Sequence, residues 1–158
     1  LNSYVSFVRG EAPETIEIIN LNNLIKKLCI SNQSKNHEII TIFEKNIETS
    51  VRPVQIKRAI QNILDNSIRY ASKIIIRLDT NDEECLISIE DNGPGIPEKN
   101  YEDIFKPFFT LDPSRNKLKG EGGLGMSIAR DIIRSHGGEI KLSKSKDNGL
   151  KTIIELPF

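Results

Sequence analysis

The sequence has few cysteines, few histidines and no net charge, and each of these features argues against a class of function. The 158 residues contain two cysteines and two histidines, and their formal net charge is zero. Cys29 and Cys85 are far apart and lie in apolar stretches, which favours reduced core residues of a cytosolic domain over disulfides or a metal site. A neutral chain without a polybasic run is not expected to bind nucleic acid or an anionic membrane.

Long apolar runs are missing as well. No stretch approaches the roughly 20 apolar residues that a membrane-spanning helix needs, and the first residues do not form a signal peptide. The length fits one domain, or one domain with a short appendage, and the composition is that of a globular protein. Because the chain starts at Leu1 rather than at a methionine, we expect it to be a fragment of a longer protein.

Hydrophobic periodicity predicts helices that alternate with strands. One predicted helix follows Asn20, which would cap it. A second begins at Pro53 and runs to about Ala71, and a third covers residues 124–136. The predicted strands are residues 15–19, 38–43, 74–78, 86–90, 140–142 and 151–156. Several strands are joined by short turns, so the pattern favours a mixed sheet with helices packed on one face. Residues 92–122 form a long irregular segment of the kind that is usually functional or mobile.

A carboxylate stands where an apolar strand meets a glycine-proline turn, in residues 91–97 (Asp-Asn-Gly-Pro-Gly-Ile-Pro). Strand side chains alternate, so Asp91 shares one face with Cys85, Ile87 and Ile89. A carboxylate facing a core is costly without a partner. The amino group of a ligand would be one partner, and the turn's own backbone, in an Asx-turn, would be another.

Two glycine clusters flank the irregular segment. Gly93 and Gly95 allow the backbone to approach a flat ligand closely, or they serve only to form the turn. Residues 120–125 (Gly-Glu-Gly-Gly-Leu-Gly) open directly into a helix. The free N–H groups and positive end of a helix favour phosphate there, whereas a plain linker before a helix is the alternative.

Asn62, Asn66 and Tyr70 recur every four residues on the helix that begins at Pro53. They form a polar stripe beside the predicted buried stripe. An amide oxygen can join the oxygen ligands of Mg²⁺, which also takes water and phosphate oxygens, and Tyr70 could stack on a base. A solvated polar flank with a packed tyrosine is the alternative.

Aromatic residues inside the irregular segment, and the two histidines, each have a simple structural interpretation. Residues 105–109 (Phe-Lys-Pro-Phe-Phe), which Arg115 follows, either dock on a partner or anchor the loop to its own core. His37 lies where a loop meets a strand, and neither it nor His136 has neighbouring acids or metal ligands. His136 ends a helix, where a cation would favour the negative end of the dipole. We therefore expect both histidines to be structural.

Four motifs follow one another between residues 50 and 140. In this order they resemble the N, G1, F and G2 boxes of the catalytic, ATP-binding domain of bacterial sensor histidine kinases, in the GHKL ATPase superfamily. The boxes are residues 61–70, 91–96, 105–109 and 122–126. The resemblance implies the two-layer α/β sandwich of that superfamily, the Bergerat fold, which agrees with the mixed sheet expected from periodicity.

The resemblance also implies roles in binding ATP and Mg²⁺. Asn66 would bind Mg²⁺ with Asn62 nearby, and Arg69 would approach the phosphates. Tyr70 would pack on the adenine, and Asp91 would accept a hydrogen bond from its amino group. The other nucleotide-binding residues that it implies are Gly93, Gly95, Ile96, Phe108, Gly122, Gly123, Leu124 and Gly125.

A lid is implied from about residue 99 to residue 121, with Arg115 helping to position the γ-phosphate. Glu121 departs from the pattern, because many relatives have a glycine at the start of the G2 box. Relatives of the chaperone and gyrase type place a water-activating glutamate where Asn62 stands here. An amide cannot act as a general base, which argues against ATP hydrolysis as the reaction.

The implied activity is that of a protein-histidine kinase, which passes the γ-phosphoryl group of Mg-ATP to a histidine and then to a response regulator. Residues 1–14 resemble only the end of the dimerisation hairpin and a linker, and residues 15–158 resemble the catalytic domain. We expect the acceptor histidine on a missing hairpin, and the parent to be a homodimer in the bacterial inner membrane with this domain in the cytoplasm. Residues 52–59 and 129–132 are similar to osmosensor kinases of the EnvZ type. The alternative is a degenerate nucleotide-binding or scaffolding domain of the same fold.

Overall fold

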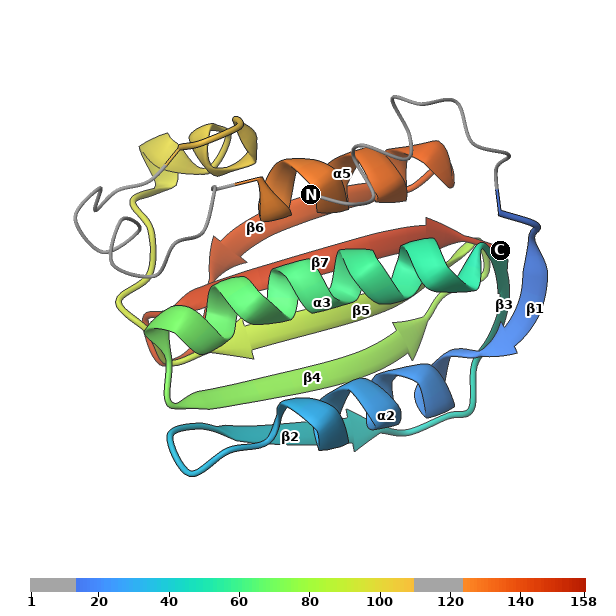
Figure 1. The fold of residues 1–158 in the computed structure, drawn as a ribbon, viewed down its shortest axis with the longest axis horizontal. Helices are drawn as coiled ribbons and strands as arrows, with labels where there is room; N and C mark the ends of the chain where they lie inside the picture. Colours follow the sequence, from blue (N-terminus) through green and yellow to red (C-terminus); the bar gives the residue numbers. More distant parts are fainter. Residues whose placement is uncertain (1–13, 110–123) are drawn as a thin grey trace.

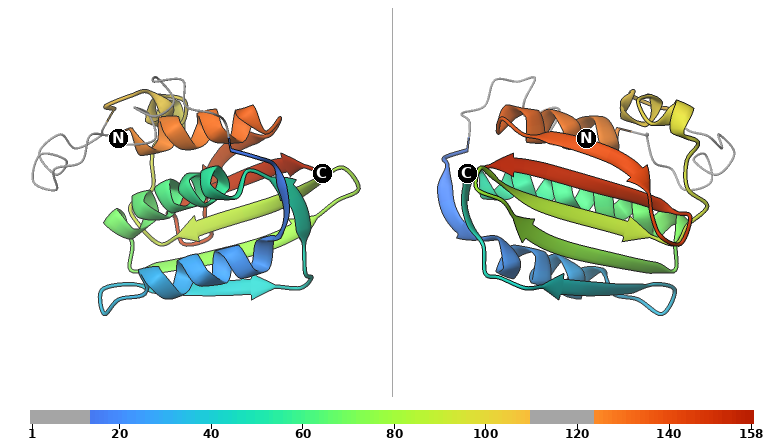
Figure 2. Two further views of the ribbon diagram at one scale, coloured as in Figure 1. Left: turned by 45° about the vertical axis from the view of Figure 1, so that its right-hand side comes forward. Right: turned by 180° about the vertical axis from the view of Figure 1, so that it is seen from behind.

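The computed structural model describes residues 14–109 and 124–158, which form a sheet covered by helices. Helices α2, α3 and α5 lie on one face of the sheet, and no helix formed by residues 14–109 or 124–158 lies on the opposite face (Figures 1 and 2). This is the two-layer α/β sandwich that the sequence predicted. The elements are β1 Glu17–Asn20, α2 Leu21–Asn32, β2 Glu38–Phe43, β3 Glu48–Val51, α3 Pro53–Tyr70, β4 Lys73–Thr80, β5 Glu84–Asp91, the 3-10 helices η1 Glu98–Asn100 and η2 Asp103–Phe105, α5 Gly125–Ser135, β6 Glu139–Lys144 and β7 Leu150–Pro157.

The main sheet is mixed, as expected. Its five strands lie in the order β2-β4-β5-β7-β6, and β2 and β4 are parallel while the other neighbours are antiparallel. A second, two-stranded sheet pairs β1 with β3. Strand β3 was not predicted, because its four residues are too few for alternation to stand out from a turn. This topology brings the ends of β5 and β6 and the start of β7 to one edge of the molecule.

The helices begin and end with the capping groups that their sequences offer. Asn20 accepts a hydrogen bond from the backbone N–H of Asn23, at 2.9 Å, at the start of α2. Helix α3 begins with Pro53, and the carboxylate of Glu14 accepts hydrogen bonds from its first free amides, at 2.8 and 3.1 Å. Gly137, with φ 79°, ends α5 in the left-handed conformation.

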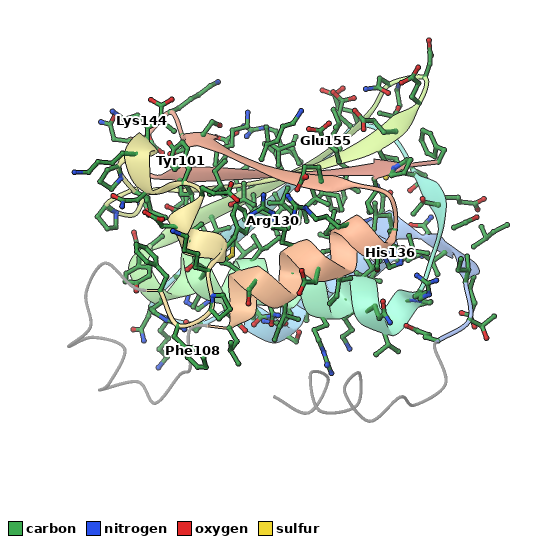
Figure 3. The ribbon with its side chains drawn as sticks, turned by 90° about the horizontal axis from the view of Figure 1, so that it is seen from above. Tyr101, Phe108, Arg130, His136, Lys144 and Glu155 are labelled. Carbon is green, nitrogen blue, oxygen red and sulfur yellow. The ribbon has the colours of Figure 1, made fainter. Side chains whose placement is uncertain are left out.

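His136 links the end of α5 to the start of α3 (Figure 3). Its Nδ1 donates to the carbonyl of Ile132 at 2.8 Å, and its Nε2 accepts from the backbone N–H of Arg52 at 3.1 Å. These two hydrogen bonds agree with the structural role expected for His136.

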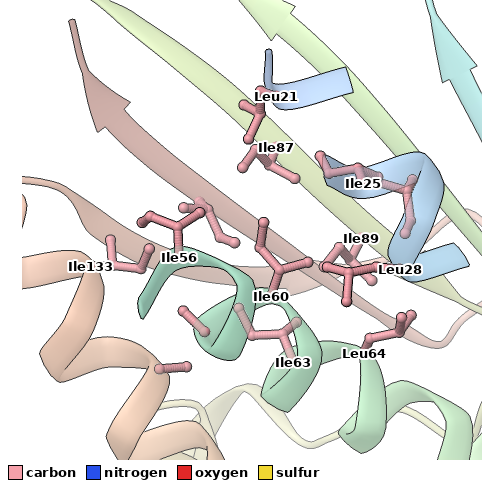
Figure 4. Close-up of a cluster of buried hydrophobic side chains, with 14 of the residues drawn as sticks. Leu21, Ile25, Leu28, Ile56, Ile60, Ile63, Leu64, Ile87, Ile89 and Ile133 are labelled. Carbon is pink, nitrogen blue, oxygen red and sulfur yellow. The ribbon is translucent and has the colours of Figure 1, made fainter. Parts of the chain in front are cut away.

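The core lies between the helices and the sheet (Figure 4). Helix α3 contributes a fully buried stripe, and Ile87 and Ile89 of β5 meet it from the sheet. Each such side chain contributes about 1.5–3 kcal/mol by leaving water. Helix α5 buries Met126, Ala129 and Ile133. Ile128, on the same helix, is only partly buried.

Candidate functional site

Asp91 is the last residue of β5, the central strand of the main sheet, and is only 7 % exposed. Its Oδ1 accepts hydrogen bonds from the backbone N–H groups of Gly93, at 2.9 Å, and Leu150, at 3.1 Å. Its Oδ2 accepts no hydrogen bond within the described part of the chain. The Asx-turn interpretation is thus correct for one oxygen, while the other keeps its acceptor capacity for the amino group of a ligand.

The glycines of the Asp91 turn are needed for packing as well as for the turn. Gly95 has φ 73°, and a Cβ atom added there would lie 2.6 Å from the carbonyl oxygen of Asn148. A Cβ atom on Gly93 would lie 3.1 Å from both Oδ1 of Asp91 and the carbonyl oxygen of Tyr70. Side chains at these two positions would push the turn away from the end of α3 or from the β6–β7 connection.

The polar stripe of α3 lies against the start of α5. Asn62, Asn66 and Tyr70 are each partly buried. Gly125, the first residue of α5, is so close to α3 that an added Cβ atom would lie 3.7 Å from Cβ of Asn62. The amide side chains of Asn62 and Asn66 form no hydrogen bonds within the described residues. The fold therefore brings Asn62, in the first of the four motifs, close to Gly125, in the last of them.

Arg69 and Tyr70 end α3 beside the Asp91 turn. The Arg69 guanidinium carbon lies 5.9 Å from the centroid of the Tyr70 ring. Both residues also border an open groove of about 580 Å³ that the sequence did not predict. Its lining consists of Ser34, Asn36, His37, Ile68, Arg69, Tyr70, Ala71, Ser72 and Asn92. His37 itself bonds to Ser34 and to the carbonyl of Asn32, so its role is structural, as expected.

The F-box motif divides into an anchor and an exposed aromatic residue. Phe105 is 8 % exposed and belongs to the core, and the Arg130 guanidinium carbon lies 4.5 Å from its ring centroid. Phe108 is 69 % exposed and has φ 64°, which is unusual for a residue with a bulky side chain. It lies near an edge of the molecule in Figure 3. The anchoring interpretation therefore holds for Phe105 and not for Phe108.

Several residues of the predicted site lie outside the described residues. They are Arg115, Glu121, Gly122 and Gly123. Leu124 is described, and its carbonyl accepts hydrogen bonds from the hydroxyl of Ser127, at 2.8 Å, and the N–H of Ile128, at 3.0 Å, in the first turn of α5. Ile96 is partly buried within the Asp91 turn.

Sequence reasoning missed the connection between β6 and β7, which contacts Asp91 directly. The Ser145 hydroxyl donates to the carbonyl oxygen of Asp91 at 2.7 Å and accepts from the N–H of Gly149 at 2.9 Å. Residues 147–149 (Asp-Asn-Gly) are typical of a hairpin turn. That signal would have predicted the turn, but not its contact with a residue more than 50 positions away.

This site can be compared with known proteins. A family model described as "Histidine kinase-, DNA gyrase B-, and HSP90-like ATPase" matches residues 51–158, which is more than half of the chain. The chain belongs to this family. It is the catalytic, ATP-binding domain of a two-component sensor histidine kinase, as the order of its four motifs predicted.

Individual relatives agree with this family. The domain is 39 % identical over 107 residues to the sensor histidine kinase GtrS of Pseudomonas aeruginosa, covering 67 % of this chain and 22 % of GtrS. It is 28 % identical over 151 residues to the sensor histidine kinase WalK of Bacillus subtilis, covering 92 % of this chain and 25 % of WalK. The solved catalytic domain of the histidine kinase ThkA superposes with a TM-score of 0.79 at 30 % identity, covering 90 % of this chain and 95 % of that domain. The kinase domain described here thus spans about a quarter of the length of GtrS or WalK.

Two features are absent from the described part of this kinase domain. No helix in residues 14–109 and 124–158 is long and apolar enough to cross a membrane. The same residues contain no cluster of three or more histidine, cysteine, aspartate or glutamate side chains that could hold a metal ion.

Proposed function

We propose that this domain binds Mg-ATP and donates its γ-phosphoryl group to a histidine on a dimerisation hairpin of the same kinase, from which a response regulator receives it. The observation that carries the proposal is the half-satisfied carboxylate of Asp91. One oxygen is held by two backbone amides, and the other is available beside the partly buried end of α3. An acceptor held in this way favours a ligand that brings a donor, such as the amino group of adenine.

The base and phosphates would lie along α3. Asp91 recognises the adenine amino group, Tyr70 packs on the ring, and Gly93, Gly95 and Ile96 shape the floor of the pocket. Arg69 approaches the phosphates, and Phe108, an exposed residue of the proposed lid, closes over the nucleotide. The backbone amides at the start of α5, with Gly122, Gly123, Leu124 and Gly125, face the phosphates, because a helix N-terminus favours anions.

Asn66 would hold Mg²⁺, with Asn62 one turn away. The side chains fit this role, because both amides keep their oxygens unbonded within the described residues, and Asn62 lies beside Gly125 at the start of α5. When bound, the ion would neutralise charge on the phosphates. Asn62 cannot activate a water molecule as a carboxylate would, which keeps ATP from hydrolysis. Arg115, in the lid, would position the γ-phosphate.

Phosphoryl transfer needs few reacting groups from this domain. It requires positioning of the nucleotide and stabilisation of charge, and the nucleophile comes from the acceptor histidine. Neither His37 nor His136 can serve, since both ring systems are engaged in structural hydrogen bonds. The domain alone should therefore bind ATP and turn it over slowly.

The wider setting of the domain follows from the family. We propose that residues 15–158 are the catalytic domain, that residues 1–14 join it to the dimerisation hairpin, and that residues from about 99 to 121 form the lid. We further propose a homodimeric parent in the bacterial inner membrane, with this domain in the cytoplasm. Membership of the EnvZ type rests on residues 52–59 and 129–132 and stays part of this proposal.

A calorimetric titration with ATP, with and without Mg²⁺, tests the proposal. The wild-type domain should bind one ATP, and Asp91→Asn, whose amide nitrogen cannot accept, should lose most of the affinity. Asp82→Asn, in the exposed β4–β5 turn, is the matched control and should bind as wild type does. Absence of binding by the wild-type domain would instead favour a degenerate scaffolding domain of the same fold.

A further inference from the structure

The β6–β7 connection, residues 145–149, packs against the turn that follows Asp91 and forms hydrogen bonds with Asp91. Ser145 is 7 % exposed, and its hydroxyl forms hydrogen bonds in both directions. It donates to the carbonyl oxygen of Asp91 at 2.7 Å and accepts from the N–H of Gly149 at 2.9 Å. The next residue, Leu150, gives its N–H to Oδ1 of Asp91 at 3.1 Å. Main chain and side chain of Asp91 are thus held by one short segment.

The two segments are packed too closely for either to shift. A Cβ atom added to Gly149 would lie 2.1 Å from the carbonyl oxygen of Asp91 and 2.5 Å from its Oδ1. On the other side, a Cβ atom on Gly95 would lie 2.6 Å from the carbonyl oxygen of Asn148. Asn148 itself has φ 64°, which asparagine tolerates better than most residues. The β6–β7 connection therefore fits closely against the Asp91 turn, and a side chain larger than glycine at position 149 or 95 would overlap it.

We propose that Ser145 is a positioning residue for recognition of the nucleobase, an inference that rests on the proposed function. By fixing the carbonyl of Asp91 and the N–H of Gly149, it keeps Leu150 in place to occupy Oδ1 of Asp91. Oδ2 is then the oxygen presented to the pocket. Ser145 acts through Asp91 and does not touch the nucleotide. Its effect is consequently on the preference for a base that carries an amino group, and not on the affinity for phosphates.

Only a small residue with both a donor and an acceptor suits this position. Ser145→Ala would leave two buried backbone groups, the Asp91 carbonyl and the Gly149 N–H, without their partner. Buried groups in that state recover hydrogen bonds by moving or by admitting water. Either response would let Asp91 rotate. Ser145→Thr keeps the hydroxyl and Ser145→Cys keeps the volume with a weaker donor, so the three variants separate hydrogen bonding from packing.

The experiment compares affinities for ATP and for purine riboside triphosphate, which has no amino group on the base. The wild-type domain should prefer ATP. Ser145→Ala should lose about tenfold in affinity for ATP, the equivalent of one misplaced hydrogen bond, and less than about twofold for the purine analogue. Ser145→Thr should restore the preference for ATP, and the preference of Ser145→Cys should lie between those of wild type and Ser145→Ala. Ser145→Cys also tests the proposal if the alanine variant does not fold. Ser143→Ala, on β6, is the matched control, because the Ser143 hydroxyl forms no hydrogen bond to Asp91 in the described part of the chain.

The amide resonances of Gly93 and Leu150 give a readout without nucleotide. Both amides bond to Oδ1 of Asp91, so both should shift in Ser145→Ala and stay unchanged in Ser143→Ala. If Ser145→Ala keeps the wild-type preference, or weakens both nucleotides equally, the positioning role is wrong while the proposed function stands. If the wild-type domain binds neither nucleotide, the proposed function itself fails.

Discussion

Arg130 of α5 and Glu102, which lies between η1 and η2, form an ion pair with two contacts. Nη1 of Arg130 lies 2.6 Å from Oε1 of Glu102, and Nη2 lies 3.3 Å from Oε2. The same guanidinium group covers the ring of Phe105. Glu102, in the described start of the proposed lid, is therefore held by the helix whose first residues are proposed to face the phosphates.

Removal of the Arg130 guanidinium should loosen this part of the lid. Arg130→Met keeps the aliphatic stem but loses the ion pair and the cation–π contact, for a cost of about 1–2 kcal/mol. Limited trypsin digestion should then cleave faster after Lys99 or Lys106. The control is Arg134→Met, whose side chain is half-exposed and pairs with Glu139. Equal cleavage rates in both variants would show that Arg130 does not hold the segment.

The Glu102–Arg130 pair should also make stability depend on acid. The hydrogen bond from Arg130 holds the pKa of the Glu102 carboxyl below its usual value of 4.5. The folded state thus binds fewer protons here, so the contribution is present above pH 4.5 and is lost as pH falls through the lower folded value. The free energy of unfolding of wild type and Glu102→Gln should differ at pH 7 and converge toward pH 3. A constant difference across that range would contradict the assignment.

The two cysteines should be inert in the folded domain. Burial raises the pKa of the Cys29 thiol from 9.0 to about 11, and burial also raises the pKa of Cys85. A thiol-specific reagent at pH 8 should therefore react only after unfolding, since the thiolate is the reactive form. The folded state keeps the Cys29 proton while the unfolded state loses it above pH 9.0, so stability should fall between pH 9 and 11. Cys29→Ala should flatten that decline.

Alanine at Gly149 should destabilise the domain far more than alanine at Gly137. The added Cβ atom at Gly149 would overlap backbone atoms of Asp91, at 2.1 Å, and the cost should be about 3 kcal/mol or more. At Gly137 the nearest atom is 3.5 Å away, and the left-handed backbone alone costs about 1–2 kcal/mol. Urea denaturation of both variants measures the two costs. Equal losses would mean that the β6–β7 connection can move away from Asp91.

Much of the fold could be predicted because its signals are local. The capping of α2 by Asn20, the start of α3 at Pro53 and the left-handed Gly137 after α5 all depend on neighbours within one turn. Burial of Asp91 followed from the alternation of β5. The four-residue strand β3 was missed, because its pairing with β1 decided it.

The sequence by itself determined which residues form the candidate site: the stripe of α3, the carboxylate that ends β5 and the glycines at the start of α5. These are spacing patterns, and spacing on a helix or strand sets the face on which a side chain lies. Only the tertiary structure decided that Ser145 and Leu150 hold Asp91, that Arg130 fastens Glu102, and that Phe105 is buried while Phe108 is exposed. Those contacts join residues far apart in the chain. They exist because the pairing of β5 with β7, and the packing of α5 on α3, place distant segments within a few ångströms of one another.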